Sequence, residues 1–183
     1  MIREINVKEI TKNIKEMCIE ANYTLSPDMD KAMKKAAEEE KSELGTKILN
    51  QLQENLVIAD SEKIPICQDT GMAVVFVDIG QEIHFTGGQL EEAIHEGVRQ
   101  GYTEGYLRKS VVKDPVRRGN TGDNTPAMIY TEIVPGEQIK ITVGPKGFGS
   151  ENMSAIRMFK PSAGLQGIKD FILETVETAG PNP

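Results

Sequence analysis

The sequence predicts an α+β protein in which an N-terminal helical layer packs on a small mixed or antiparallel sheet of about four strands. Two observations support this prediction. Apolar residues recur at three- and four-residue steps through residues 7–60, which is the spacing of a buried helical face. Short β-branched runs then become common between residues 74 and 143. Helices followed by strands mixed with helices are typical of α+β folds.

Three helices are expected before residue 60. The first covers residues 7–22, and its apolar stripe consists of Ile10, Ile14, Met17, Cys18 and Ala21. The second begins at Ser26, because serine is a good N-cap and Pro27 fits the first helical position. The third follows Gly45, and its stripe consists of Ile48, Leu49, Leu52 and Leu56. Cys18 lies on the first stripe and is therefore expected to be a small buried apolar residue.

The rest of the chain predicts strands, one central helix and one closing helix. In order, we expect a buried strand at 74–79, a strand at 82–85 that pairs with it, a helix at 90–106, strands at 127–134 and 138–143, and a helix at 168–176. Pro135-Gly136 joins the two later strands by a short turn, so they are expected to form a β-hairpin. The whole chain, residues 1–183, is expected to be a single domain.

Charge and composition narrow the functional classes. The chain has 28 acidic and 21 basic residues and a net charge of -7, which disfavours binding to a phosphate backbone. No apolar stretch is long enough for a membrane helix. The N-terminus lacks the pattern of a secretory signal, and two cysteines are too few for a disulfide framework. We therefore expect a cytoplasmic protein that binds neither nucleic acid nor membrane.

The loop at residues 64–71 holds the cysteine that is not on a helical stripe. Cys67 is followed by Gln68, Asp69 and Gly71. A thiolate in such a turn can be a nucleophile, a redox centre or a metal ligand, and an inert structural cysteine is an equally good interpretation. A nucleophilic cysteine needs a histidine as its base. His84 is expected in a strand and His95 on a helix, where exposed polar roles are commoner than catalytic ones, so the nucleophile hypothesis is weak.

Two further loops are rich in glycine and small polar residues. Residues 120–126 form either an anion-binding nest or a turn stabilised by its own side chains. Residues 144–152 resemble a phosphate loop only superficially, because Lys146 precedes the glycines instead of following them. A carboxylate-binding loop remains open. Six basic residues form either one cationic patch or a solvated face: Arg99, Arg108, Lys109, Lys113, Arg117 and Arg118.

Four motifs in order carry a family resemblance. They are Cys67-Gln68-Asp69-Thr70-Gly71, Arg108 with Ser110-Val111-Val112 and Asp114-Pro115, Asn120 to Pro126, and Lys146 to Asn152. The chain resembles the class I fumarate hydratase family and its close relative L(+)-tartrate dehydratase, as the α subunit of the two-subunit forms. The resemblance spans nearly the whole chain. It departs from the family at Phe148, where many members have glycine.

The resemblance implies a hydro-lyase that contains a [4Fe-4S] cluster and reversibly hydrates fumarate to (S)-malate in the tricarboxylic acid cycle. It implies that Cys67 is a cluster ligand and that Gln68, Asp69, Arg108 and Gly149 contact the dicarboxylate substrate. Asp69 is in addition the candidate catalytic proton donor. It also implies a β subunit as partner and an α-α contact between two copies of the chain.

Family members continue beyond Pro183 with a second ligand cysteine. The chain is therefore expected to be the N-terminal portion of an α subunit, truncated before that cysteine, without a cluster of its own and inactive alone. Two alternatives remain open. One is an L(+)-tartrate dehydratase α subunit, and the other is a non-catalytic carboxylate-binding or assembly module.

Overall fold

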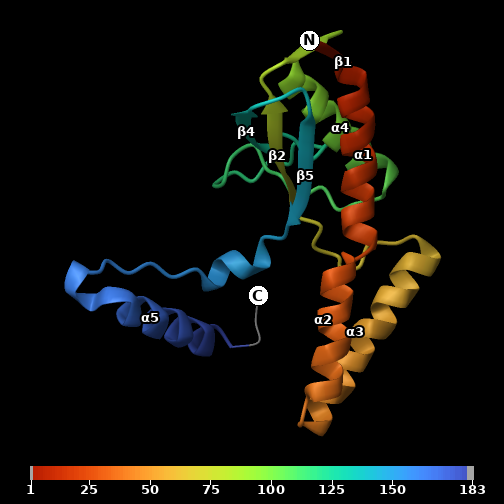
Figure 1. The fold of residues 1–183 in the computed structure, drawn as a ribbon. Helices are drawn as coiled ribbons and strands as arrows, with labels where there is room; N and C mark the ends of the chain where they lie inside the picture. The colour runs from red at the N-terminus through yellow and green to blue at the C-terminus, as the bar shows by residue number, and fades with distance from the viewer. Residues whose placement is uncertain (1, 181–183) are drawn as a thin grey trace. The chain divides into compact units, whose positions relative to one another are not determined.

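The computed structural model describes residues 2–180 of the chain and divides it into two compact units, Met1–Lys146 and Gly147–Pro183. The elements are drawn in Figure 1. The first unit contains β1 (Arg3–Asn6), α1 (Val7–Tyr23), α2 (Pro27–Glu39), α3 (Glu43–Glu62), β2 (Met72–Gly80), β3 (Ile83–Thr86), α4 (Leu90–Glu104), β4 (Met128–Val134) and β5 (Ile139–Lys146). The second contains the 3-10 helices η1 (Gly149–Met153) and η2 (Pro161–Ala163) and the helix α5 (Gly164–Ala179). The predicted α+β class is confirmed.

The larger sheet has the strand order β4-β2-β5, with β2 parallel to β4 and antiparallel to β5. The predicted hairpin of residues 127–134 with 138–143 is therefore wrong, because β2 lies between the two strands. The connection between them instead bonds to the end of β2: Gly80 N–H donates to Gln138 O at 2.8 Å and Gln81 N–H to Val134 O at 2.8 Å. Val75 and Val77 on β2 are fully buried. Because β2 is the central strand, it pairs with a neighbouring strand along both of its edges.

The smaller sheet pairs β1 with β3 in parallel, with Arg3 opposite Ile83. The predicted pairing of residues 82–85 with 74–79 is wrong. A turn at Gln81 and Glu82 leads the chain out of the larger sheet, and Arg3 N–H donates to Glu82 O at 2.8 Å. The strand β1 was not predicted, because four residues are too few to show a periodic pattern.

The helices α1 and α4 pack against each other, and α1 also contacts β5 (Figure 1). The core that they share with the sheet includes Ile14, Cys18, Val75, Val77, Ile94, Val98 and Tyr102. The prediction for Cys18 is confirmed: it is 1% exposed, and burial raises the pKa of its thiol to about 12.

The second and third predicted helices are confirmed as α2 and α3, which pack against each other. The helix α3 begins before Gly45, because the Ser42 hydroxyl accepts a hydrogen bond from Gly45 N–H at 3.2 Å and caps the helix. No helix within residues 2–180 is long and apolar enough to cross a membrane.

Candidate functional site

The Cys67 loop connects α3 to β2 and holds its sulfur at the surface. The Cys67 thiol is exposed, donates to Gln68 Oε1 at 3.4 Å and accepts from Asp69 N–H at 3.4 Å. The Asp69 carboxylate accepts from Gly71 N–H at 3.2 Å. Gly71 has a φ of 57°, which a residue without Cβ adopts at little cost. The turn therefore fixes Asp69 while the thiol stays accessible.

Arg108 lies next to this loop. The Thr70 hydroxyl donates to Arg108 O at 3.0 Å, and the Tyr102 hydroxyl on α4 donates to Thr70 O at 2.8 Å. Tyr102 is buried, and desolvation raises its pKa, so the phenol remains a hydrogen-bond donor. The Arg108 side chain is exposed. The structure thus brings the first two predicted motifs together, with Gln68, Asp69 and Arg108 on adjoining segments.

The loop at residues 120–126 completes this arrangement through Asn124, whose side chain is fully buried. Its Nδ2 donates to Gly71 O at 3.0 Å, and its Oδ1 accepts from Ser110 N–H at 2.7 Å and Val111 N–H at 3.0 Å. One amide therefore links three of the four motifs. Asn124 was not singled out from the sequence, although an asparagine in a loop of turn residues was the available signal.

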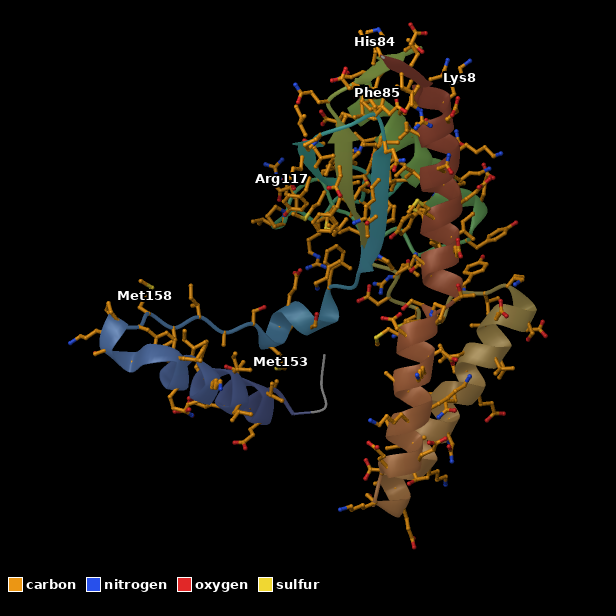
Figure 2. The ribbon with its side chains drawn as sticks, viewed as in Figure 1. Lys8, His84, Phe85, Arg117, Met153 and Met158 are labelled. Atoms are coloured by element: carbon orange, nitrogen blue, oxygen red, sulfur yellow. The ribbon has the colours of Figure 1, made fainter. Side chains whose placement is uncertain are left out.

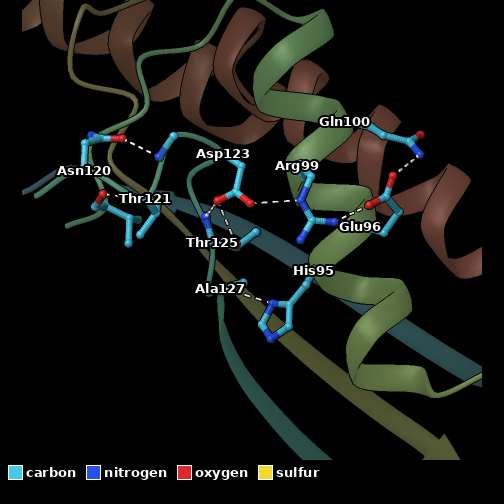
Figure 3. Close-up of polar contacts among 11 residues, drawn as sticks. His95, Glu96, Arg99, Gln100, Asn120, Thr121, Asp123, Thr125 and Ala127 are labelled. Atoms are coloured by element: carbon cyan, nitrogen blue, oxygen red, sulfur yellow. Dashed lines mark hydrogen bonds and ion pairs between the residues drawn. The ribbon is translucent and has the colours of Figure 1, made fainter. Parts of the chain in front are cut away.

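The same loop is stabilised by its own side chains, as one of the two sequence interpretations expected. Asn120 Oδ1 accepts from Gly122 N–H at 2.7 Å, and Asp123 Oδ1 accepts from Thr125 N–H at 3.0 Å and from the Thr125 hydroxyl at 2.8 Å. These contacts are shown in Figure 3. The loop therefore has a defined shape before any ligand binds.

An ion pair fastens this loop to α4 (Figure 3). Arg99 Nε donates to Asp123 Oδ2 at 2.9 Å, and Arg99 also pairs with Glu96. Desolvation tends to raise the pKa of Asp123, but the hydrogen bonds from Arg99 and Thr125 outweigh it and hold the pKa below its ordinary value. Arg99 is therefore neutralised by two carboxylates, and it does not belong to a free cationic patch.

The remaining basic residues lie on a surface loop. Asp114 Oδ1 accepts from Val116 N–H at 2.8 Å and Arg117 N–H at 2.7 Å, which shapes a turn at the tip. Arg117 and Arg118 are exposed, and Arg117 lies at the periphery of the first unit (Figure 2). Arg117 and Arg118 therefore fit the solvated face, which is one of the two interpretations of the sequence.

His95 has a structural contact. Its Nδ1 accepts from Ala127 N–H at 3.3 Å, and its Nε2 lies 3.7 Å from Glu91 Oε1. Beside it, between α4 and β4, lies a hollow of about 460 Å³ whose lining includes Ile94, His95 and Ile129 but none of the predicted site residues.

The fourth motif crosses from the first unit into the second. Lys146 ends β5, and Gly149 begins η1. Within η1, the Asn152 side chain donates to Gly149 O at 3.0 Å. The expected loop is thus partly a short helix, and the role of Gly149 at the substrate site remains a prediction.

The cysteines differ in what they offer a metal. Cys67 presents an exposed sulfur, whereas Cys18 is buried in the core. Within residues 2–180 no group of three or more histidine, cysteine and acidic side chains is arranged to hold a metal ion. An exposed thiol in an ordered turn fits a single ligand position.

Comparison with known proteins agrees with the motif order. A model of the fumarate hydratase (Fumerase) family matches residues 11–183. The chain belongs to this family. It is 39% identical over 180 residues to the putative L(+)-tartrate dehydratase subunit alpha of Methanocaldococcus jannaschii. The aligned residues make up 96% of this chain and 63% of the relative.

Two relatives from Escherichia coli K12 extend the comparison. The anaerobic class I fumarate hydratase is 31% identical over 183 residues, covering 98% of this chain and 33% of the relative. The L(+)-tartrate dehydratase subunit alpha is 27% identical over 191 residues, covering 100% of this chain and 62% of the relative. The chain thus spans less than two thirds of each of these relatives. Their names denote hydro-lyases, which add or remove water.

Proposed function

We propose that this chain is part of a hydro-lyase that adds water to, or removes it from, a four-carbon dicarboxylate. The observation that carries the proposal is the junction of the first two motifs, where Thr70 ties the Cys67-Gln68-Asp69 turn to Arg108 at 3.0 Å. The junction places a thiol, an amide, a carboxylate and a guanidinium on adjoining ordered segments.

The proposed roles follow from the chemistry of each side chain. Arg108 presents a planar fork that binds a carboxylate through two parallel hydrogen bonds. Gln68 offers a neutral amide to the substrate, and Gly149 is proposed to line the site through its backbone. Asp69 transfers the proton at the carbon next to the departing hydroxyl. Its oxygen is oriented by Gly71 N–H, as a proton-transferring group requires.

Cys67 is proposed to be one ligand of a [4Fe-4S] cluster, in keeping with its exposed sulfur. When bound, a cluster with one iron not ligated by protein supplies a Lewis acid that assists departure of the hydroxyl. The other cluster ligands would lie outside the residues described. Cys18 is not among them, because its thiol is buried and its pKa is about 12.

Two substrate pairs fit this chemistry, and their hydroxy acids, (S)-malate and L(+)-tartrate, differ by one hydroxyl. Fumarate, hydrated to (S)-malate, is our first candidate, and a class I fumarate hydratase is 31% identical to the chain. L(+)-tartrate is the second, and a protein named as a tartrate dehydratase α subunit is 39% identical. We expect the whole enzyme, assembled without oxygen, to turn over one of them. Equal inactivity on malate, fumarate and tartrate would contradict the hydro-lyase and favour a non-catalytic carboxylate-binding module.

The proton-transfer role predicts the effect of one substitution. Asp69→Asn in the whole enzyme is expected to lower kcat by about 100-fold or more, because the amide cannot exchange the proton. Steady-state assays measure this. The control is Asp60→Asn on α3, where the carboxylate pairs with exposed Lys63, and it is expected to retain activity. An Asp69→Asn enzyme with unchanged kcat would remove Asp69 from catalysis.

Two protein partners are also proposed. The relatives named as α subunits support a β subunit that completes the enzyme. A contact between two copies of this chain is proposed from the family. Light scattering of the whole protein, with and without the partner subunit, measures both, and a monomer under both conditions would contradict them.

A further inference from the structure

Asn124 contacts both segments that carry the proposed substrate groups. An asparagine side chain has two N–H donors and acceptor capacity for two hydrogen bonds. Here three of these four positions are used, by Gly71 O on one side and by Ser110 N–H and Val111 N–H on the other. The side chain has no exposed surface, so water does not compete for these bonds.

The geometry selects asparagine at this position. Asn124 has a φ of 62°, and asparagine tolerates this left-handed conformation better than most residues. An ionised aspartate would accept from the same two amides but would have no hydrogen to donate to Gly71 O. Glutamine is one methylene longer and would not fit the same three partners without a backbone shift. The bridge therefore depends on this side chain.

We propose that Asn124 is a positioning residue, which holds Arg108 at a fixed distance from Gln68 and Asp69 so that all three contact one dicarboxylate. The inference rests on the proposed function. Ser110 and Val111 follow Arg108 directly, and Gly71 follows the turn that carries Gln68 and Asp69. The Asn124 amide thus sets the spacing between the two backbones from which these groups extend.

The segments need such a bridge because neither lies in a helix or in a strand of the two sheets. A second link, from the Thr70 hydroxyl to Arg108 O at 3.0 Å, runs beside the Asn124 bridge. With both links the segments cannot slide along each other, whereas one link allows a pivot. A misplacement of 1 Å can cost about 100-fold in rate, so a pivot that moves Arg108 relative to Gln68 and Asp69 impairs their joint contact with the substrate even when the fold persists.

The test is a double-mutant cycle in the whole enzyme. Asn124→Asp keeps the acceptor oxygen and nearly the same volume but loses the donor to Gly71 O. We expect the KM for the dicarboxylate to rise by about tenfold. In an Arg108→Lys background, which lacks the fork, the same change is expected to raise KM by less than about threefold, because the two residues act as one unit. Equal factors in both backgrounds would overturn the proposal.

A matched control separates positioning from general loss of stability. Thr11→Val removes the hydrogen bond from the Thr11 hydroxyl to Ala93 O, 2.9 Å long, between α1 and α4. It is expected to lower Tm while changing KM by no more than about twofold. A rise in KM equal to that of Asn124→Asp at the same loss of Tm would overturn the inference. Asn124→Ser, measured below its own Tm, provides a second variant if the aspartate variant does not fold.

The proposed function and this inference fail in different ways. If the wild-type enzyme turns over a dicarboxylate and the cycle is additive, only the role of Asn124 is overturned. If it turns over none, calorimetric titration with malate and with tartrate replaces KM in the same cycle. Coupling between Asn124 and Arg108 in those titrations would support the inference without the hydro-lyase. Absence of any binding by the wild-type protein would overturn both.

Discussion

The two cysteines have opposite environments, one buried and one exposed. Cys18 faces the core from α1, where burial raises the pKa of its thiol to about 12. Cys67 lies in an exposed turn and accepts a backbone N–H. A cysteine ligand has to be accessible to the metal. Of the two cysteines, Cys67 is exposed and Cys18 is buried, so Cys67 meets this condition.

The lowered pKa of Asp123 predicts how the stability of the protein depends on pH. Its pKa in the folded protein lies below the ordinary value, so its contribution to stability is present above a pH of about 4 and is lost as pH falls further. Asp123→Asn is expected to lower the free energy of unfolding by about 1 kcal/mol at neutral pH, because the pair with Arg99 is partly exposed.

Urea unfolding of the wild-type protein and of Asp123→Asn across a series of pH values measures the difference in their free energies of unfolding. It should shrink as the solution is acidified below a pH of about 4. Asp60→Asn is the control, because its exposed partner Lys63 is the C-cap residue of the same helix and a surface pair contributes little. A difference for Asp123→Asn that stays constant down to the acid transition would contradict the assigned ion pair.

At the scale of elements, the close approach of α1 and α4 depends on glycines on α4. A Cβ at Gly97 would lie 2.7 Å from Ile14 Cβ, and one at Gly101 would lie 2.8 Å from Cys18 Cβ and 3.0 Å from Lys15 O. Glycines four residues apart share one helical face. The polar contact from the Tyr23 hydroxyl to Gly105 O, 2.8 Å long, continues this interface.

Gly101→Ala therefore tests two opposing effects. Alanine favours a helix by about 1 kcal/mol, but overpacking against atoms fixed to the α1 backbone costs about 1–3 kcal/mol. We expect a net loss of stability, measured by thermal unfolding. The control is Gly119→Ala, because no atom lies within 4 Å of the Cβ that it would add. Increased stability of Gly101→Ala would show that the helices separate at little cost.

At the scale of the whole molecule, the proposed cluster draws on more protein than the residues described. Cys67→Ser in the whole protein is expected to abolish cluster absorbance and activity together, since a serine hydroxyl does not replace a thiolate ligand for iron. Iron and sulfide analysis with visible absorption spectroscopy measures cluster content. Cys18→Ala is the control and is expected to retain the cluster with reduced stability. A Cys67→Ser protein with full cluster content would contradict the ligand assignment.

The helices α2 and α3 and the second unit leave apolar side chains exposed. They include Leu44 at 67% on α3 and Leu173 at 63% on α5.

The helices and the family can be predicted from local patterns in the sequence. Apolar spacing of three and four residues is a local property, so α1, α2, α3, α4 and α5 were each expected close to where they lie. The order of four short motifs identified the family and directed attention to Cys67. These signals need no knowledge of which distant segments meet.

The strand order and the junction of the site depend on contacts between segments that are far apart in the sequence. Both neighbours of β2 are set by contacts between distant residues, so a turn signal at Pro135-Gly136 wrongly predicted a hairpin. The bridge from Asn124 to Gly71 joins residues 53 positions apart, and its bond to Ser110 spans 14. Hydrogen bonds over such separations leave no periodic trace in a sequence, because their partners become neighbours only after the core has formed.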